Sequence, residues 1–380
     1  MKVLIVVTHL LGAGHLSRAL TLARAFAAEG HCVTVASGGV PVPQFDCRAV
    51  DLVQLPPLRS DGADFTTLLT AQGLSADAAY LTSRSDMLCA LAQDLAPDIV
   101  ITELYPFGRR ILRAEFLALL QVVAAQRPRP VILASVRDIL APPSRPERAV
   151  AADEVVTRFY QGVLVHSDPA ITRLQESWPV SDALAAKLIY TGYVAPAPAE
   201  PHPDAAGTDE VLVSAGSGAV GTTLFNVAIA AAGLSGDRRW RLLVGGAGSA
   251  DRIRDLTAHA GSAPVIIEPA RADFRQMLRH AACSVSLCGY NTALDLLQAG
   301  TSAVFVPFDE GGEVEQTIRA HSLSANPGIR MLVAEDLTPH ALLEAMAQAM
   351  ATRPAQSLQP DFDGAAQTVQ VATRLARARG

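Results

Sequence analysis

The sequence predicts an α/β protein made of two Rossmann-like, doubly wound parallel-sheet domains that face a central cleft. Short apolar, β-branched runs alternate with helical patterns along nearly the whole chain, as in buried parallel strands joined by crossover helices. The alternation stops once, at a proline-rich segment, and then starts again. Glycine-rich turns follow strands on both sides of that segment. A length of 380 residues agrees with two domains.

The first half opens with a βαβ unit. Val3–Val7 is an apolar strand, Leu16–Glu29 has apolar residues on one helical face, and Cys32–Ala36 is the next strand. Residues 57–75 are too long and irregular for a simple connection, and long loops of this kind are often functional. The remaining elements of this half are strands over Asp98–Thr102, Pro130–Ser135 and Gly162–Val165, and helices over Arg109–Gln126 and Arg148–Tyr160.

A change of composition divides the chain. Four prolines between Ala195 and Pro203 indicate a semi-rigid linker. The predicted organisation is a first domain over 1–197, a linker over 198–208, a second domain over 209–357 and a C-terminal helix over 358–380, with packing of that helix on the first domain left open. The second domain has strands over Glu210–Ser214, Trp240–Val244, Pro264–Ile267, Ser284–Leu287, Ala303–Val306 and Met331–Val333. Helices lie between them, over Thr222–Ala232, Ala250–Ala260, Ala272–His280, Thr292–Ala299, Glu313–Ala320 and Pro339–Met350, and the last helix covers Ala365–Ala376.

Three predicted strand-to-helix turns carry glycine and small polar residues: Gly12–His15, Ser214–Ala219 and Cys288–Thr292. Parallel sheets bind ligands at the carboxyl ends of their strands, and a helix N-terminus there favours an anion. A tight βα turn without a ligand is the alternative for each turn taken alone. Three such turns in two domains predict a cleft for a phosphorylated ligand.

Several classes of function are disfavoured. The loop Gly12–Ser17 lacks the third glycine of a dinucleotide fingerprint, Ser37–Gly39 stands where its acid belongs, and no Walker A lysine motif occurs. A net charge of −6 without a basic block argues against nucleic acid. Five cysteines fit neither a disulfide framework nor a zinc site, and no run of about 18 apolar residues suggests a membrane span. A cytoplasmic protein is expected.

The C-terminal half resembles glycosyltransferase family 28, the group that contains the lipid II-forming GlcNAc transferase. Cys288–Phe308 has that family's small-Gly-x-x-Thr, helix acid, Ala-Gly, strand and proline in order, and Glu315-Gln316 follows. His9–Arg18 resembles the glycine-rich first loop of GT-B enzymes. Glu103–Arg110 and Ser135–Leu140 are similar to a bacterial branch of predicted glycosyltransferases. The resemblance spans nearly the whole chain and implies a GT-B fold.

The resemblance also implies an activity and a donor site. The activity is a metal-independent, inverting transfer from a nucleotide-sugar, with a UDP-sugar favoured. Asp295 binds the donor ribose, although the family usually has a glutamate there, and Glu315 and Gln316 contact sugar hydroxyls. The other implied donor contacts are Gly12, Gly14, Ser214, Gly216, Ser217, Gly218, Arg271, Ala272, Gly289, Asn291 and Thr292.

The acceptor hydroxyl needs a base, typically worth about 10²–10⁴-fold in rate. His15 ends the first loop, and its ordinary pKa near 6.5 suits that role. A phosphate contact and a helix cap are the alternatives for His15. Glu103 follows a predicted strand, so it orients His15 or is itself the base. A structural salt bridge to Arg109 or Arg110 is equally compatible with its position.

Other predictions concern the acceptor and the metal. His9, Tyr105 and Arg137 are acceptor-side candidates, whereas His166 receives no role. Asp361–Asp363 is the single Asp-x-Asp triplet and is interpreted as a helix start, so neither metal nor other cofactor is expected. The acceptor stays open between a saccharide, a lipid-linked sugar and a small molecule, as does peripheral contact with the inner membrane. The alternative functions are a nucleotide-sugar hydrolase, a 2-epimerase and a non-catalytic nucleotide-sugar sensor.

Overall fold

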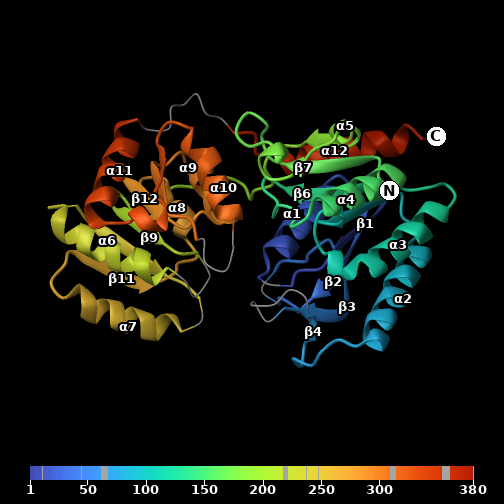
Figure 1. Cartoon of the computed structure of the whole chain (residues 1–380), viewed down its shortest axis with the longest axis horizontal. Coiled ribbons are helices and arrows are strands. Elements are labelled where there is room, and N and C mark those ends of the chain that lie inside the picture. The colour runs from blue at the N-terminus through green and yellow to red at the C-terminus, as the bar shows by residue number, and fades with distance from the viewer. Residues whose placement is uncertain are drawn as a thin grey trace. The chain divides into compact units, whose positions relative to one another are not determined.

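The chain forms two compact α/β units (Figure 1). The first comprises Met1–Pro196 with Asp361–Gly380, and the second comprises Ala197–Pro360. The computed structural model describes all residues except 11, 44, 61–66, 217–220, 237, 247, 309–313, 353–359 and 380. The predicted donor contacts Ser217 and Gly218, and part of the 57–75 segment, therefore lie outside the described residues.

The first unit is built on an eight-stranded sheet in the order β4-β3-β2-β1-β5-β6-β7-β8. The strands are β1 (Lys2–Val7), β2 (Cys32–Gly39), β3 (Asp51–Arg59), β4 (Leu69–Thr70), β5 (Ile99–Glu103), β6 (Val131–Arg137), β7 (Gly162–His166) and β8 (Leu188–Tyr190). All neighbouring strands are parallel except β3 and β4. The order reverses at β1, which lies between β2 and β5, and open parallel sheets bind ligands at such a switch point.

Helices cover both faces of this sheet, and each face has its own apolar core. The helices are α1 (Gly14–Ala28), α2 (Ala78–Leu95), α3 (Arg113–Ala125), α4 (Pro146–Phe159), α5 (Asp182–Ala185) and α12 (Gly364–Arg377), with short 3₁₀ helices η1 (Arg110–Leu112) and η2 (Leu174–Glu176). Strands such as β5 are buried along their whole length, which explains their continuous apolar sequence.

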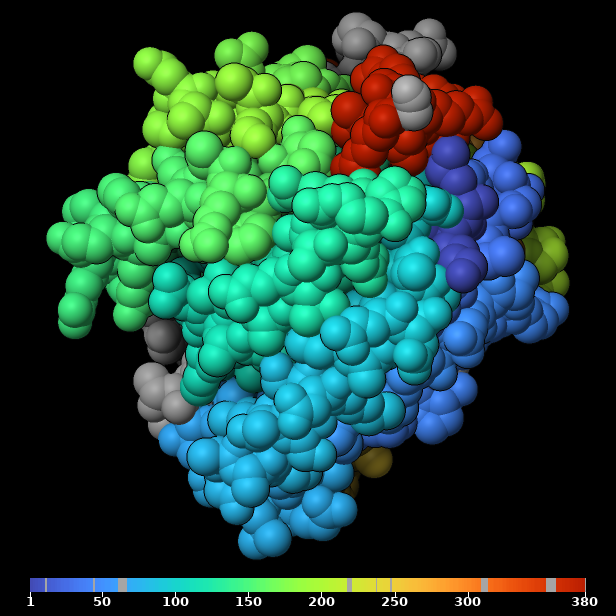
Figure 2. Space-filling view, turned by 90° about the vertical axis from the view of Figure 1, so that its right-hand side faces the viewer, coloured from blue at the N-terminus to red at the C-terminus, as the bar shows by residue number. Residues whose placement is uncertain are grey.

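The C-terminal helix α12 belongs to the first unit. Tyr193 N donates to Asp361 O at 2.7 Å, and Val194 forms a bridge with Asp363. Val369 and Ala372 of α12 then join the core beneath α1. In the space-filling view the red C-terminal helix lies beside blue N-terminal residues (Figure 2).

The second unit has six parallel strands in the order β11-β10-β9-β12-β13-β14. They are β9 (Val211–Ser214), β10 (Trp240–Val244), β11 (Val265–Pro269), β12 (Cys283–Ser286), β13 (Ala303–Phe305) and β14 (Ile329–Met331). The helices are α6 (Thr222–Leu234), α7 (Ser249–Ala260), α8 (Phe274–Leu278), α9 (Tyr290–Ala299), α10 (Glu315–Ser324) and α11 (Pro339–Ala351), with the 3₁₀ helix η4 (Ala334–Asp336). Its switch point lies between β9 and β12.

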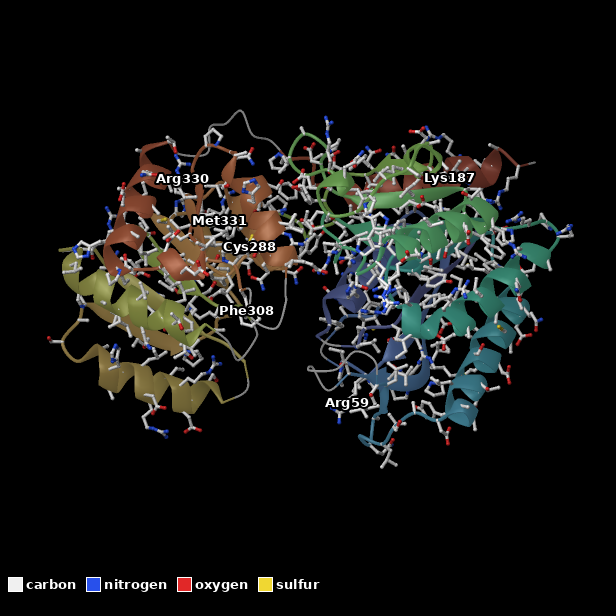
Figure 3. All side chains as sticks on the ribbon, viewed as in Figure 1. Arg59, Lys187, Cys288, Phe308, Arg330 and Met331 are labelled. Carbon is white, nitrogen blue, oxygen red and sulfur yellow. The ribbon has the colours of Figure 1, made fainter. Side chains whose placement is uncertain are left out.

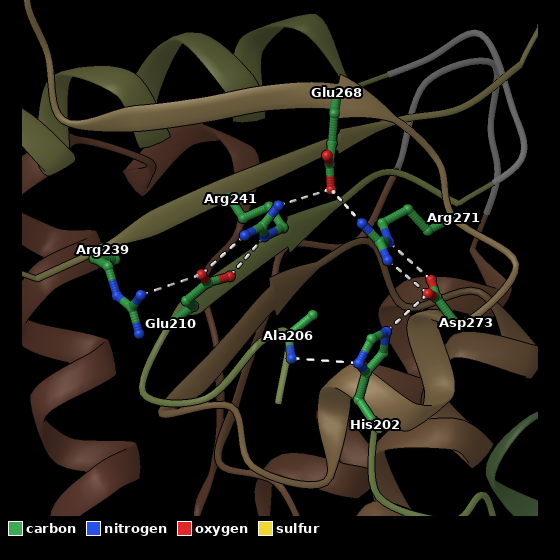
Figure 4. A network of polar contacts seen from close by, with 8 residues as sticks. All are labelled: His202, Ala206, Glu210, Arg239, Arg241, Glu268, Arg271 and Asp273. Atoms are coloured by element: carbon green, nitrogen blue, oxygen red, sulfur yellow. Dashed lines mark hydrogen bonds and ion pairs between the residues drawn. The ribbon is translucent and has the colours of Figure 1, made fainter. Parts of the chain in front are cut away.

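The segment expected as a linker, 198–208, is part of the second unit. His202 Nδ1 accepts from the Asp204 backbone N–H at 3.1 Å, so its Nε2 donates to Asp273 Oδ2 at 3.0 Å. The network continues through Arg271, Glu268, Arg241 and Glu210 (Figure 4). These contacts fasten the proline-rich segment to the second sheet.

Two parts of the fold differ from the sequence-based expectation. The strand expected over Met331–Val333 is β14, which ends at Met331. The expected irregular segment 57–75 begins inside β3 and contains the short strand β4. Within the described part of the chain, no helix has both the length and the apolar character needed to cross a bilayer.

Candidate active site

His15 and Glu103 meet at the switch point of the first sheet. His15 lies in the first turn of α1, directly after the loop that follows β1, and Glu103 is the last residue of β5. Because β1 and β5 are parallel neighbours, their carboxyl ends lie side by side. The His15 Nδ1 atom is 2.9 Å from Glu103 Oε1.

Glu103 is a buried carboxylate with three polar partners. Its residue is 2% exposed, Ser135 Oγ donates to Oε2 at 2.6 Å, and Arg18 donates to Oε1. Burial alone raises the pKa of this carboxyl, but Arg18, His15 and Ser135 outweigh it and hold the pKa below the ordinary value. The sequence left a salt bridge to Arg109 or Arg110 open; the ion pair of Glu103 is with Arg18 instead.

The protonation of His15 follows from that charge. An ionised carboxylate can only accept, so Nδ1 carries the imidazole proton and Nε2 keeps its lone pair. Burial lowers the pKa of His15 to about 3, against the raising effect of its bond to Glu103. The side chain retains 14% exposure, so the neutral ring is accessible. A neutral imidazole held by a carboxylate can take a proton from a hydroxyl, and the carboxylate then stabilises the imidazolium.

The loop between β1 and α1 is held by two arginines. Arg109 Nε donates to Thr8 O, and Arg84 Nη2 donates to Thr8 Oγ1 at 2.8 Å. Arg84 is itself fully buried and paired with Glu115, whose Oε2 lies 2.6 Å from Arg84 Nε. This ion pair fixes the backbone from which the His15 loop begins.

A pocket of about 360 Å³ opens beside this loop. It is lined by His9–Ala13 without residue 11, by Val40–Val42 after β2, and by Arg59 and Ser60 at the end of β3. Arg59, labelled in Figure 3, is the one arginine or lysine among the described lining residues. Sequence reasoning placed an acceptor pocket in the 57–75 segment but did not single out Arg59.

The three acceptor-side candidates lie in different places. His9 lines the pocket, and its Nε2 donates to Val40 O at 2.9 Å, while burial lowers its pKa. Tyr105 is buried in the core and stacks on Phe116 with ring centroids 4.4 Å apart, so it does not line this pocket. Arg137 ends β6 and donates to Ile139 O at 3.2 Å. The structure therefore keeps His9 beside the dyad loop and separates Tyr105 from the pocket.

At the switch point of the second sheet, β9 ends on Ser214. Its residue is 7% exposed, and its hydroxyl has no hydrogen-bond partner among the described residues. The turn continues through Gly216, which has a φ of +69°. A side chain at Gly245 would bring its Cβ within 2.4 Å of Gly216 O, so the loops after β9 and β10 pack backbone against backbone. Ser214 is therefore a buried donor that a ligand can satisfy.

The neighbouring strand β12 leads into α9. Gly289 is the N-cap of this helix and offers no side chain to its first N–H groups. Asn291 and Thr292 occupy the first helical turn, and Cys288, labelled in Figure 3, precedes it. Because β9 and β12 are parallel neighbours, the Ser214 turn and the start of α9 lie at the same edge of the sheet.

Asp295 lies one turn further along α9, where its Oδ1 accepts from Arg275 Nε at 2.9 Å. Burial raises the pKa of Asp295 to about 6, even though Arg275 opposes the rise. The Arg275 guanidinium also donates to Ala197 O at 2.8 Å and to Gln298. Asp295 is therefore a half-satisfied carboxyl with one arginine partner, at 18% side-chain exposure.

The remaining donor candidates lie elsewhere in the second unit. Arg271 follows β11 and pairs with Asp273 and Glu268 (Figure 4), and Ala272 beside it is exposed. Gln316 Oε1 accepts from Phe308 N at 3.3 Å, and Glu315 is the first residue of α10. The structure brings Ser214 and the start of α9 together, whereas Arg271 lies at the end of the edge strand.

Known proteins share this fold and part of this sequence. Residues 243–372 match the model of the glycosyltransferase family 28 C-terminal domain. The crystal structure of MurG from Acinetobacter baumannii superposes with a TM-score of 0.67 at 16% identity, covering 98% of this chain and 100% of that one. The chain is a glycosyltransferase with the GT-B fold.

Two further solved structures share this fold. The glycosyltransferase VinC in complex with dTDP has a TM-score of 0.60 at 15% identity and full coverage of both chains. A UDP-glucosyltransferase from Polygonum tinctorium has 0.61 at 14% identity, covering 100% of this chain and 98% of that one. No curated protein sequence matches the chain.

Four residues of the glycosyltransferase site were missed from the sequence: Arg18, Ser135, His166 and Thr191. Ser135 pairs in register with Glu103, and His166 ends the next strand. A signal existed, because each is a polar residue at the end of an apolar strand. What the sequence could not show is that their side chains turn toward one another.

The Asp-x-Asp triplet of this glycosyltransferase lies where the chain enters α12. Asp361 N donates to Asp168 Oδ2 at 3.2 Å, and Asp363 N donates to Asp361 Oδ1 at 2.8 Å. Asp361 O also accepts from Tyr193 N. The triplet thus shapes the segment that joins α12 to the first unit. In the described part of the chain, no three His, Cys, Asp or Glu side chains group closely enough to hold a metal ion.

Proposed function

We propose that this glycosyltransferase moves a sugar from a nucleotide-sugar to an acceptor hydroxyl in a single, inverting displacement with His15 as general base. The observation that carries the proposal is the buried bond between His15 Nδ1 and Glu103 Oε1, which leaves Nε2 able to accept a proton. Nε2 takes the hydroxyl proton while the hydroxyl oxygen bonds to the anomeric carbon. The bond from that carbon to the diphosphate breaks, and its electron pair leaves with the nucleoside diphosphate.

We assign the donor to the second unit. The Ser214 hydroxyl, unpartnered among the described residues, and the start of α9 at Gly289 are suited to a diphosphate. A helix N-terminus contributes about 0.3–1 kcal/mol when exposed and up to about 2 when partly buried. Side chains therefore have to add to it, and Ser214 is one of them. The proposal uses no metal ion, and Asp295 binds the ribose hydroxyls, as the family resemblance implies.

UDP is the first nucleotide of the proposal. The family 28 resemblance favours it, and the UDP-glucosyltransferase named above has the same fold. VinC was solved with dTDP, which makes a dTDP-sugar the next donor to examine. The proposal does not assign the sugar itself.

We assign the acceptor to the pocket of the first unit. Its wall is the same β1–α1 loop that carries His15, so a molecule held there can present a hydroxyl to Nε2. His9 and Arg59 are its polar contacts. A saccharide, a lipid-linked sugar or a small molecule all satisfy this requirement.

A donor screen tests the proposal. Melting temperatures are measured with UDP-, dTDP- and GDP-sugars, because a ligand that binds the folded state stabilises it by RT ln(1 + [L]/Kd). The sugar nucleotide that binds is then incubated with and without an acceptor mixture, with and without EDTA, and the anomer is read by NMR. We expect transfer with inversion that EDTA does not reduce. Turnover without acceptor would instead indicate a hydrolase or epimerase, and binding without turnover a sensor.

A further inference from the structure

Behind Glu103, a line of hydrogen bonds crosses three strands of the first sheet. Ser135 Oγ on β6 lies 2.6 Å from Glu103 Oε2 on β5 and 3.0 Å from His166 Nε2 on β7. His166 Nδ1 lies 2.8 Å from Thr191 Oγ1, just after β8. Ser135 and His166 are 0% exposed and Thr191 is 1% exposed. No solvent is needed to link Glu103 to Thr191.

The direction of the line is set by the charge of Glu103. Ser135 has one hydroxyl proton, which it can donate to Glu103 or to His166 but not to both. A bond to a charged acceptor is shorter and about twice as strong as a neutral one, and the bond to Glu103 is the shorter of the two. Ser135 therefore donates to Glu103 and accepts from the Nε2–H of His166.

The rest of the line follows from that assignment. Burial lowers the pKa of His166 to about 3, so the ring is neutral, and with a proton on Nε2 its Nδ1 is an acceptor. Thr191 Oγ1 then donates to Nδ1, in competition with Gly192 O at 3.0 Å. Every donor in the line points toward Glu103.

We infer that Ser135, His166 and Thr191 are positioning residues, which hold the Glu103 carboxylate toward His15 through one directed hydrogen-bond chain. This inference rests on the proposed role of His15. Ser135 occupies Oε2, so Oε1 is left for His15 and Arg18. A carboxylate that lost its Oε2 partner could turn, and the Nδ1–H tautomer of His15 would no longer be fixed.

The chain also affects the pH at which the dyad works. The charged and titratable groups facing Glu103 are His15 and Arg18 on α1 and, through Ser135, His166 on β7, with Arg109 near His15. Removing the Ser135 donor leaves more charge on the carboxylate. The carboxylate then stabilises the His15 imidazolium more strongly, so the pKa values of both members of the dyad rise. The acid limb of the pH–rate profile moves to higher pH.

The test compares variants that remove donors one at a time. We expect Ser135→Ala to lower kcat by about tenfold, with unchanged KM for both substrates, because it removes a bond to a charged group. Thr191→Val should lower kcat by on the order of threefold, since it removes a neutral bond. His166→Phe should match Ser135→Ala, while His166→Gln, whose amide can still donate to Ser135, should recover most of the rate.

A second measurement is independent of any substrate. The ¹⁵N chemical shifts of the imidazoles in the free full-length protein report each tautomer, and we expect Nε2–H for His166 and Nδ1–H for His15. In Ser135→Ala the His15 tautomer should become mixed. The control is Ser284→Ala, which removes an equally buried hydroxyl in the second unit that has no partner among the described residues.

An Nδ1–H tautomer for His166, or an acid limb that stays in place in Ser135→Ala, overturns the inference. If no sugar is transferred by the unmodified protein, the proposed function fails, while the tautomers still decide whether the chain points toward Glu103.

Discussion

The imidazole of His15 and the carboxylate of Glu103 are 88 residues apart in the sequence and 2.9 Å apart in the structure. The parallel pairing of β1 with β5 creates this contact, because Val6 lies opposite Thr102 one residue before Glu103. Everything that the dyad needs for proton transfer is therefore contributed by the first unit. The second unit can be altered without disturbing it.

The first prediction concerns the charge of Glu103. In Glu103→Gln the amide is neutral and can donate as well as accept, so the Nδ1–H tautomer of His15 is no longer enforced. We expect kcat to fall by about 10²–10⁴-fold, the usual worth of a general base, with the donor Kd unchanged. Initial rates and calorimetric titration of the sugar nucleotide measure the two quantities.

Glu210→Gln is the matched control for that variant. Glu210 is also a buried acid paired with arginine, but it lies at the start of β9 in the second unit. It should lose stability and keep kcat. Equal losses of kcat in both variants would show that burial, and not the dyad, explains the effect.

The second prediction concerns Ser214. Its hydroxyl has no partner among the described residues, so Ser214→Ala should leave the melting temperature of the ligand-free protein unchanged or slightly higher. If the hydroxyl binds the diphosphate, the same change should weaken UDP binding by about tenfold or more, since a bond to a charged group is lost. Thermal shift and titration with UDP measure both effects.

Ser235 offers the opposite behaviour. Its hydroxyl donates to Ala232 O at 2.9 Å and accepts from Trp240 Nε1 at 2.9 Å. Ser235→Ala should therefore lower the melting temperature and leave the UDP affinity alone. Unchanged UDP affinity in Ser214→Ala would remove Ser214 from the donor site.

The strands that carry the site could be found from the sequence, and the side-chain partners could not. Val3–Val7 and Asp98–Thr102 are short apolar runs that stop at polar residues, and these patterns located the ends of β1 and β5 within one residue. By contrast, β3 contains Pro56 and Pro57 and has mixed burial, so no clear strand period is present.

Side-chain partners depend on rotation and register, which the pattern of residue types does not contain. Arg18 reaches Glu103 because it lies one turn after His15 on the buried face of α1. The sequence favoured Arg109 and Arg110 because they are close to Glu103 along the chain. Likewise, His166 had no assigned role because its relation to Glu103 passes through Ser135 on the strand between them.

The third prediction concerns pH and Asp295. Its pKa in the folded state is about 6, against an ordinary 3.8. Between these values the folded state binds more protons than the unfolded state, so stability falls as pH rises from about 4 to 6. The total is up to about 3 kcal/mol by the linkage of pKa to stability. Asp295→Asn should abolish this part of the slope, as measured by urea unfolding between pH 4 and 7.

Asp273 should behave in the opposite way. Its bonds to Arg271 and His202 hold its pKa below the ordinary value, so its contribution to stability is present at neutral pH and is lost on acidification. Asp273→Asn should therefore reduce stability at pH 7 and have little effect at low pH. If both variants change the slope in the same direction, the assigned environment of Asp295 is wrong.

The fourth prediction concerns the support beneath the His15 loop. A Cβ on Gly38 would lie 1.9 Å from Arg84 Nη2 and 2.4 Å from Thr8 Oγ1. Arg84 cannot yield easily, because its guanidinium is buried between Glu115, Thr8 and the carbonyl of Gly38 itself. Gly38→Ala should therefore break the buried ion pair and destabilise the first unit by about 3–5 kcal/mol.

The matched control for Gly38→Ala is Gly233→Ala in the second unit. Gly233 lies in α6 with nothing within 4 Å of an added Cβ, so alanine there should stabilise by about 0.5–1 kcal/mol through its better helix propensity. Because Arg84 also bonds Thr8 at the start of the His15 loop, Gly38→Ala should lower kcat in molecules that remain folded. Melting temperature and rate are measured on the same samples. A Gly38→Ala protein as stable and active as the unmodified one would mean that Arg84 moves aside at little cost and that the loop is held by Arg109 alone.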